Sequence, residues 1–269
     1  MLRVVGRRSD GYHRLQTIFR FLDYGDELGI TVREDGVVRA LHVLPGVDPA
    51  NDLTVRAARL LKQATGTTLG ADIALVKKLP LGGGLGGGSS DAASVLLALN
   101  ELWRAGLSRR ELQALALELG ADVPVFVFGQ SAFAEGIGEE LTPLTLPPAW
   151  YVVLTPPVSV ATAGVFAHPD LKRDSKAIKI RRFSVGALAN HAVNDLEALV
   201  CRLYPDVARY LDWLKQHGPA LMTGSGAAVF ASFDTEDAAR AVMAQLPVGM
   251  SGFVARGMDR HPLRELARD

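Results

Sequence analysis

The sequence has 269 residues, of which 48% are apolar, enough to bury the core of one large domain or of two ordinary ones. Lysine plus arginine number 29 and aspartate plus glutamate number 29, a balance that argues against a nucleic-acid coat or a polybasic membrane anchor. Cys201 is the one cysteine, which excludes an intramolecular disulfide, and the six histidines show no metal-ligand spacing. No apolar stretch reaches the roughly 18 residues of a membrane helix, and the N-terminus lacks a signal-peptide core. We therefore expect a cytoplasmic protein.

In the first half of the chain, the apolar residues switch between a period of two, typical of strands, and one near 3.6, typical of helices. Residues 28–33 and 37–43 predict two strands, and Glu34-Asp35-Gly36 between them predicts a hairpin. The other predicted elements are helices over 53–64 and 91–103, a strand over 71–77, and a helix that a capping box of Ser108 and Glu111 opens and that ends near Gly120.

In the second half, residues 151–155 predict a strand that Pro156-Pro157 ends, and we place a domain boundary there, dividing 1–152 from 153–269. Residues 172–182 hold six basic side chains, which favours a solvated loop over a phosphate-binding segment. Strands and helices mix without strict alternation, which favours an α+β fold over a doubly wound one. The remaining predictions are two helices over 194–217 split at Pro205, two strands over 220–233, a helix over 234–245 and a strand over 252–256.

The strongest local signal is the glycine-rich stretch 80–93, Pro-Leu-Gly-Gly-Gly-Leu-Gly-Gly-Gly-Ser-Ser-Asp-Ala-Ala. Glycine allows positive φ, so successive N–H groups can converge on phosphate oxygens, and the helix that follows adds its positive dipole end. Gly82, Gly84 and Gly87 also match a dinucleotide fingerprint, but that spacing alone is weak and the preceding segment is a poor buried strand. A P-loop is excluded, because the stretch does not end in Gly-Lys-Ser/Thr. A flexible linker is disfavoured, because such linkers seldom run from a strand straight into an apolar helix. We therefore predict a phosphate cradle of another type.

This stretch is similar to the ATP-binding motif of the GHMP kinases, which phosphorylate galactose, homoserine, mevalonate and related alcohols. Three further segments resemble the family in the same order: Gly11-Tyr12-His13, Gly120-Ala121-Asp122-Val123-Pro124 and Thr223-Gly224-Ser225-Gly226-Ala227. The chain most closely resembles the branch that phosphorylates the 2-hydroxyl of 4-diphosphocytidyl-2-C-methyl-D-erythritol, in the non-mevalonate route to isoprenoid precursors. The resemblance implies a two-domain α+β fold with the active site in the cleft between the domains, and ATP and Mg²⁺ as cofactors. It assigns ATP binding to Pro80, Gly82, Gly83, Gly84, Leu85, Gly86, Gly87, Gly88, Ser89 and Ser90.

Asp122 resembles the catalytic aspartate of the family. Phosphoryl transfer depends mostly on positioning and charge stabilisation, and it also needs the acceptor hydroxyl oriented and often deprotonated. A carboxylate before the apolar run 123–128 could keep a proton affinity high enough for a base. The structural alternative is a helix N-cap beside Pro124, and the family resemblance favours catalysis over it.

The resemblance assigns the substrate's cytosine to aromatic and polar side chains, because an unpaired base is held by stacking and by hydrogen bonds at its edge. Tyr12 and Phe166 are expected to stack on the ring and His13 to bind its edge. Phe19 is either part of the same pocket or a core residue. The remaining expected substrate residues are Thr162, Gly224, Ser225 and Gly226, the last three near the substrate phosphates and the acceptor.

One motif of the family is missing. Its first strand normally contains Ala-Lys-Ile/Leu-Asn-Leu, in which the lysine stabilises the transferred phosphoryl group, whereas residues 1–6 resemble the end of that strand. Either the start codon has been placed too far downstream, which we favour, or the protein is a shortened one. Lys77 and Lys78 are the nearest substitutes, and a chain that begins at Met1 is expected to bind nucleotide but to turn over slowly.

Three other hypotheses stay open. The alcohol could be another one, such as mevalonate or homoserine, although Gly11-Tyr12-His13 speaks against substrates without a base. The protein could instead be a non-catalytic nucleotide-binding regulator, or a Rossmann oxidoreductase. We expect a small-molecule substrate, a monomer or weak homodimer, and no nucleic acid or membrane partner; the metal ligands are not predicted.

Overall fold

A computed structural model describes residues 1–178 and 192–269, which form two compact units. The first unit consists of Met1–Tyr24, Pro80–Leu85 and Ser131–Asp259, and the second of Gly25–Leu79, Gly86–Gln130 and Arg260–Asp269. The chain therefore passes between the units several times, whereas the boundary expected between residues 152 and 153 divides it once. The division into domains 1–152 and 153–269 remains a prediction.

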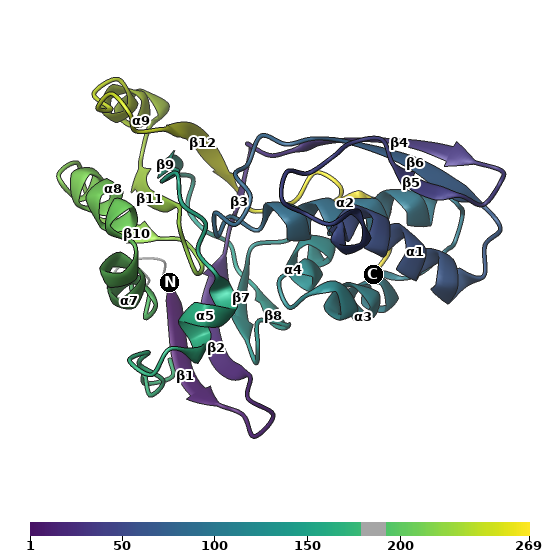
Figure 1. The fold of residues 1–269 in the computed structure, drawn as a ribbon, viewed down its shortest axis with the longest axis horizontal. Helices are drawn as coiled ribbons and strands as arrows, with labels where there is room; N and C mark the ends of the chain where they lie inside the picture. The colour runs from purple at the N-terminus through teal and green to yellow at the C-terminus, as the bar shows by residue number, and fades with distance from the viewer. Residues whose placement is uncertain (179–191) are drawn as a thin grey trace. The chain divides into compact units, whose positions relative to one another are not determined.

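The second unit is a three-stranded sheet with helices on one face. The sheet has the order β4-β6-β5, and α1 and α2 pack against it (Figure 1). Its core joins Ala57, Leu61 and Ile73 to the buried side of α2. The elements are β4 (Glu27–Arg33), β5 (Val38–Ala40), η1 (Pro49–Asn51), α1 (Leu53–Thr65), β6 (Gly70–Val76), α2 (Gly87–Leu102), α3 (Arg109–Leu119), α4 (Val123–Phe128) and η2 (Arg264–Leu266).

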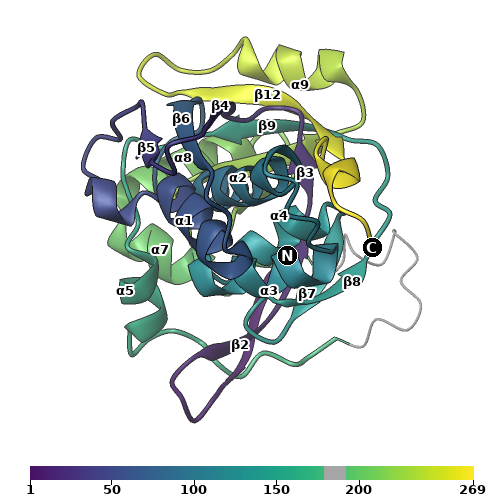
Figure 2. The same ribbon diagram turned by 90° about the vertical axis from the view of Figure 1, so that its right-hand side faces the viewer.

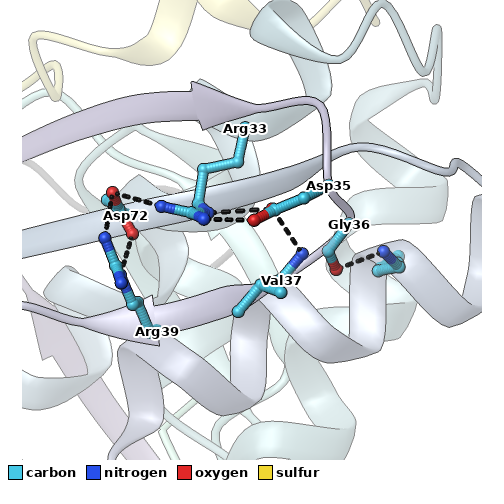
Figure 3. Close-up of polar contacts among 7 residues, drawn as sticks. Arg33, Asp35, Gly36, Val37, Arg39 and Asp72 are labelled. Atoms are coloured by element: carbon cyan, nitrogen blue, oxygen red, sulfur yellow. Dashed lines mark hydrogen bonds and ion pairs between the residues drawn. The ribbon is translucent and has the colours of Figure 1, made fainter.

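The hairpin predicted around residues 34–36 is wrong. β4 pairs antiparallel with β6, and β5 pairs parallel with β6, so a strand from about 40 residues later lies between the two neighbours in sequence. Asp72 on the middle strand accepts hydrogen bonds from Arg33 Nη1 at 3.0 Å and from Arg39 Nε at 2.6 Å (Figure 3). Asp35 binds Arg33 and the backbone N–H of Val37. β6 is the central strand of the sheet, and its side chains Ala71 and Ile73 are fully buried there.

The local helix signals of this unit are confirmed. Asp52 caps α1 through the N–H of Thr54, and Gly66 ends the helix in the left-handed conformation. The capping box of α3 is complete, because Ser108 accepts from the Glu111 N–H and Glu111 accepts from the Ser108 N–H. The helix predicted over 91–103 starts earlier than expected, at Gly87, inside the glycine-rich stretch.

The first unit contains two antiparallel sheets. One has the order β1-β2-β7-β8 and the other the order β10-β11-β9-β12-β3. Of the strand pairs among the described residues, only β5–β6 is parallel, which confirms the α+β class. The strands are β1 (Leu2–Arg7), β2 (His13–Phe19), β3 (Phe21–Leu22), β7 (Ala132–Glu135), β8 (Glu140–Pro143), β9 (Trp150–Leu154), β10 (Ala220–Met222), β11 (Val229–Phe233) and β12 (Gly252–Met258).

Helices cover one face of the larger of these sheets. Buried side chains of β9 and β11 share a core with Leu211 of α8 and Val242 of α9, and α9 lies along β12 (Figure 2). The helices among the described residues of this unit are α5 (Thr162–Ala167), α7 (Glu197–Leu203), α8 (Pro205–Lys215) and α9 (Glu236–Met243). The predicted break at Pro205 is confirmed, because Pro205 is the first residue of α8, where its missing N–H costs nothing.

No helix among the described residues is long and apolar enough to cross a membrane. The cytoplasmic location and the monomeric or weakly dimeric state expected from the sequence stay predictions. The basic segment 172–182 is described only as far as residue 178, and the rest of it lies outside the described residues.

Candidate active site

The first half of the glycine-rich stretch packs against the other glycine motif within the first unit. The backbone N–H of Ala228 donates to Gly83 O at 3.0 Å, and Thr223 Oγ1 donates to Gly84 O at 3.1 Å. Residues 82–84 and 223–228 are therefore joined by hydrogen bonds, although 139 positions separate Gly84 from Thr223. The sequence predicted both motifs but not their contact.

Gly84 has no room for a side chain. Its φ is +70°, and a Cβ there would lie 2.5 Å from Thr223 O and 2.7 Å from Gly226 O. We expect Gly84→Ala to lower the free energy of unfolding by at least ~2 kcal/mol and to weaken ADP binding, because the clash is with backbone that cannot rotate away. Urea denaturation and calorimetry with ADP measure the two effects.

Gly249→Ala is the matched control. Gly249 has φ +88° in the same unit, but no atom lies within 4 Å of its Cβ position. It should lose only the roughly 1–2 kcal/mol of left-handed backbone strain and leave ADP binding intact. Equal losses in the two variants would contradict the packing argument.

The second half of the glycine-rich stretch begins α2. Gly86 is the N-cap with φ +70°, and no side chain caps the helix, so Ser89 and Ser90 lie in its first turn and do not cap it. The first backbone N–H groups of a helix lack partners within the helix. No described residue accepts a hydrogen bond from those of Gly87, Gly88 and Ser89, so they are available for an anion at the positive end of the helix dipole. This arrangement fits the phosphates of a nucleotide.

A buried ion cluster lies behind the start of α2. Lys77 Nζ contacts Asp91 Oδ2 at 2.9 Å and also binds Asp26, whose side chain is only 2% exposed. Asp26 further accepts the backbone N–H groups of Lys78 and Leu79. A Cβ on Gly87 would lie 3.2 Å from Lys77 Nζ, so the cluster directly supports the first turn of α2.

This cluster changes the role expected for Lys77. Burial raises the pKa of Asp91 to about 6, despite the neighbouring Lys77 charge. The pKa of Lys77 is raised by its hydrogen bonds to the two carboxylates, which outweigh its own desolvation. Because Lys77 is already paired with two carboxylates, it is a poor substitute for a phosphoryl-binding cation. No role was predicted for Asp26 or Asp91, although Asp91 follows Ser89-Ser90 directly.

Asp122 stands at the head of α4. It occupies the N-cap position, yet its side chain makes no capping hydrogen bond. This observation weakens the alternative that Asp122 serves only to cap the helix. The residue is reachable by solvent, while desolvation by the surrounding protein raises the pKa of its carboxyl above the usual range. No described residue donates a hydrogen bond to this carboxylate. It therefore combines access with a raised proton affinity, as a general base requires.

Arg109 anchors the other end of α4 and was not predicted. This buried guanidinium donates to Val127 O at 2.9 Å, to Arg264 O at 2.9 Å and to Ala267 O at 2.6 Å. The first carbonyl belongs to α4, and the other two to the C-terminal segment. Arg109 thus ties the helix that begins after Asp122 to residues more than 130 positions away, which no local signal reveals.

Four of the expected substrate residues meet around α5 in the first unit. Thr162 Oγ1 and Ser225 Oγ lie 2.6 Å apart, at the start of α5 and in the β10–β11 loop. Phe166, near the other end of α5, has its ring centroid 5.1 Å from that of His13. α5 therefore links the glycine loop at 224–226 to the start of β2.

Tyr12 precedes His13 directly, and Phe19 lies at the other end of the same strand. Tyr12 is 60% exposed in the β1–β2 turn, where an aromatic face is free for a ligand. Phe19 is at the far end of β2, six residues and thus about 20 Å from His13 in an extended strand. Phe19 and His13 can therefore contact only different parts of one elongated ligand.

Comparisons with known proteins identify the family of the chain. The family model for the N-terminal domain of GHMP kinases matches residues 52–130, and the model for their C-terminal domain matches residues 175–249. The chain is 61% identical over 262 residues to the 4-diphosphocytidyl-2-C-methyl-D-erythritol kinase of Thiobacillus denitrificans, covering 97% of this chain and 93% of the relative. It is 57% identical over 269 residues to that of Nitrosospira multiformis, covering 99% and 90%.

Solved structures agree with the sequence relatives. A crystal structure of 4-(cytidine 5'-diphospho)-2C-methyl-D-erythritol kinase superimposes with a TM-score of 0.81 at 36% identity, covering 95% of this chain and 94% of that one. The Methanococcus jannaschii mevalonate kinase superimposes with a TM-score of 0.65 at 16% identity, covering 93% and 92%, and shares the fold.

Proposed function

The chain belongs to the 4-diphosphocytidyl-2-C-methyl-D-erythritol kinases, a branch of the GHMP kinase family, and on that premise we propose how its residues divide the work of the reaction. The protein is a kinase with an alcohol as acceptor. It transfers the terminal phosphoryl group of ATP to the 2-hydroxyl of 4-diphosphocytidyl-2-C-methyl-D-erythritol. The observation that carries this assignment is 61% identity over 97% of the chain.

Asp122 acts as the general base. It accepts the proton of the 2-hydroxyl as the oxygen attacks the phosphoryl group, so that the new P–O bond forms while the bond to ADP breaks. Support comes from its raised pKa, its access to solvent and its unused capping position. Arg109 maintains the position of α4 behind it.

The nucleotide phosphates bind the glycine-rich stretch. The uncapped start of α2 offers backbone N–H donors, and the hydroxyls of Ser89 and Ser90 lie in the same turn. These hydroxyls fit the oxygen ligands of Mg²⁺, which takes few ligands from protein and the rest from phosphate and water. When bound, Mg²⁺ offsets the negative charge that develops on the transferred group. The ATP-binding residues are those predicted at positions 80–90.

The cytidine part of the substrate binds residues of the first unit. Tyr12 and Phe166 stack on the cytosine ring, and His13 binds its edge. Thr162 and the loop Gly224-Ser225-Gly226 lie near the substrate phosphates and the acceptor. Phe19 contacts a part of the substrate remote from His13, or serves the core.

A coupled assay of ADP release tests the assignment. With 4-diphosphocytidyl-2-C-methyl-D-erythritol as acceptor, we expect saturable ADP release that CDP inhibits competitively, because CDP carries the same base and phosphates. Mevalonate and homoserine serve as control acceptors and should give no release above the background. Preference for either control would move the chain to another alcohol, and ATP binding without any turnover would favour a non-catalytic relative.

A further inference from the structure

Arg173 is held more firmly than a loop arginine ordinarily is. Its Nη2 donates to Phe166 O at 2.9 Å and to His168 O at 2.7 Å, and its Nη1 donates to Leu171 O at 3.0 Å and to Pro169 O at 3.4 Å. These acceptors include carbonyls at the C-terminal end of α5, which a helix leaves without partners of its own. The residue is half-buried. All but one of its five N–H donors are therefore used to fix its position.

The remaining donor points at His13. Arg173 Nε donates to His13 Nε2 at 3.0 Å, across 160 residues of sequence. A guanidinium is always protonated and has no lone pair to offer, so Nε2 must be the acceptor. In a neutral imidazole the proton then sits on Nδ1, because the partner of one ring nitrogen decides the state of the other.

The surroundings also keep the ring uncharged. His13 is 8% exposed, and burial lowers its pKa, with the charges of Arg173 and Arg7 acting in the same direction. No described residue makes a hydrogen bond with His13 Nδ1. The His13 ring can therefore offer a ligand one hydrogen-bond donor, Nδ1–H, and no acceptor.

We propose that Arg173 is a positioning residue that selects cytosine over uracil by holding His13 in the Nδ1-protonated form. On the pairing edge, cytosine offers acceptors at N3 and O2, whereas uracil carries a proton on N3. An Nδ1–H donor matches cytosine N3 and opposes uracil N3–H. This inference rests on the proposed function, because it takes the ligand of His13 to be a pyrimidine base.

The first test determines the tautomer of His13 in the wild-type chain. In the full chain labelled with ¹⁵N-histidine, long-range ¹H–¹⁵N spectra report the protonation of each ring nitrogen, and His13→Gln identifies the His13 signals among the six histidines. We expect Nδ1 protonated and Nε2 unprotonated at neutral pH. An Nε2-protonated His13 would overturn the proposal.

The second test replaces Arg173. We expect Arg173→Met to let the proton move to Nε2, to raise the pKa of His13 and to weaken CDP binding about tenfold, as the loss of one hydrogen bond to a buried group does. UDP binding should not weaken, so the preference for CDP falls, and ADP binding should stay unchanged. Arg173→Lys keeps a hydrogen-bond donor for His13 Nε2 and should therefore keep the wild-type tautomer. This variant still tests the proposal if Arg173→Met does not fold.

Arg202→Met is the control, because it removes an arginine of the same unit whose ion pair with Asp170 is exposed. It should change neither the tautomer nor the ratio of CDP to UDP affinity. An unchanged ratio and tautomer in Arg173→Met would contradict the proposal. The failure of the proposed function would be distinct: no ADP release with the methylerythritol substrate, whatever the tautomer of His13.

Discussion

Asp122→Asn should lower kcat about 10²- to 10⁴-fold, which is the usual contribution of a general base. Asparagine keeps the shape of the side chain but cannot accept the proton of the acceptor hydroxyl. The affinity for ADP should stay within about twofold of the wild type, because the nucleotide phosphates bind the glycine-rich stretch. The measurement is steady-state ADP release, with calorimetry for ADP binding.

The pH dependence of the activity is a second test of Asp122 as the general base. The pKa of Asp122 is raised by desolvation, and the base must be ionised to act. Activity should therefore increase with pH through a pKa above that of an ordinary aspartate, about 3.9. The raised pKa also means that the folded state binds this proton more tightly than the unfolded chain, so the ionised carboxylate costs stability as the pH rises.

Asp122→Asn should consequently be as stable as the wild type at neutral pH, or more so. Glu118→Gln is the control, because Glu118 is an exposed carboxylate of the same unit, on α3. It should leave kcat and its pH profile unchanged. A residual kcat within tenfold of the wild type in Asp122→Asn would exclude Asp122 as the base.

The largest loss of stability is expected from Lys77→Met, about 3–5 kcal/mol in the free energy of unfolding. The side chains of Asp26 and Asp91 are 2% and 6% exposed, and without Lys77 two buried carboxylates would face each other unpaired. Because the cluster supports the first turn of α2, the variant should also bind ADP more weakly than the wild type. Urea denaturation at neutral pH measures the first effect and calorimetry the second.

Neutralising the carboxylates should restore most of this loss. In Lys77→Met combined with Asp26→Asn and Asp91→Asn, no buried charge remains, and the asparagine at position 26 can still accept the N–H groups of Lys78 and Leu79. Arg240→Met is the control, because its ion pair with Glu236 is on the surface of α9 and is worth at most about 1 kcal/mol. If Lys77→Met loses no more stability than this control, the cluster is not what stabilises α2.

Local features were predictable because the forces behind them act within a few residues. The capping box of Ser108 and Glu111 joins backbone and side-chain groups three residues apart, and it forms as expected. The glycine-rich stretch has positive φ at Gly82, Gly84 and Gly86, which few residues other than glycine adopt. The family was also readable from four such segments, because each keeps its residues close together in the chain.

Pairing between distant segments depends on the tertiary structure. Residues 28–43 carry a valid hairpin pattern, but β6 takes the place between the two strands because its apolar side chains are buried there. The ion cluster joins positions 26, 77 and 91, and Arg173 meets His13 across 160 residues. The raised pKa of Asp122 arises from desolvation by the folded protein, although the residue stays open to solvent. The sequence by itself determined the helices, the glycine motifs and the family, since these depend on neighbours along the chain. Only the tertiary structure decided strand order, charge pairing and protonation, since these depend on which groups exclude water together.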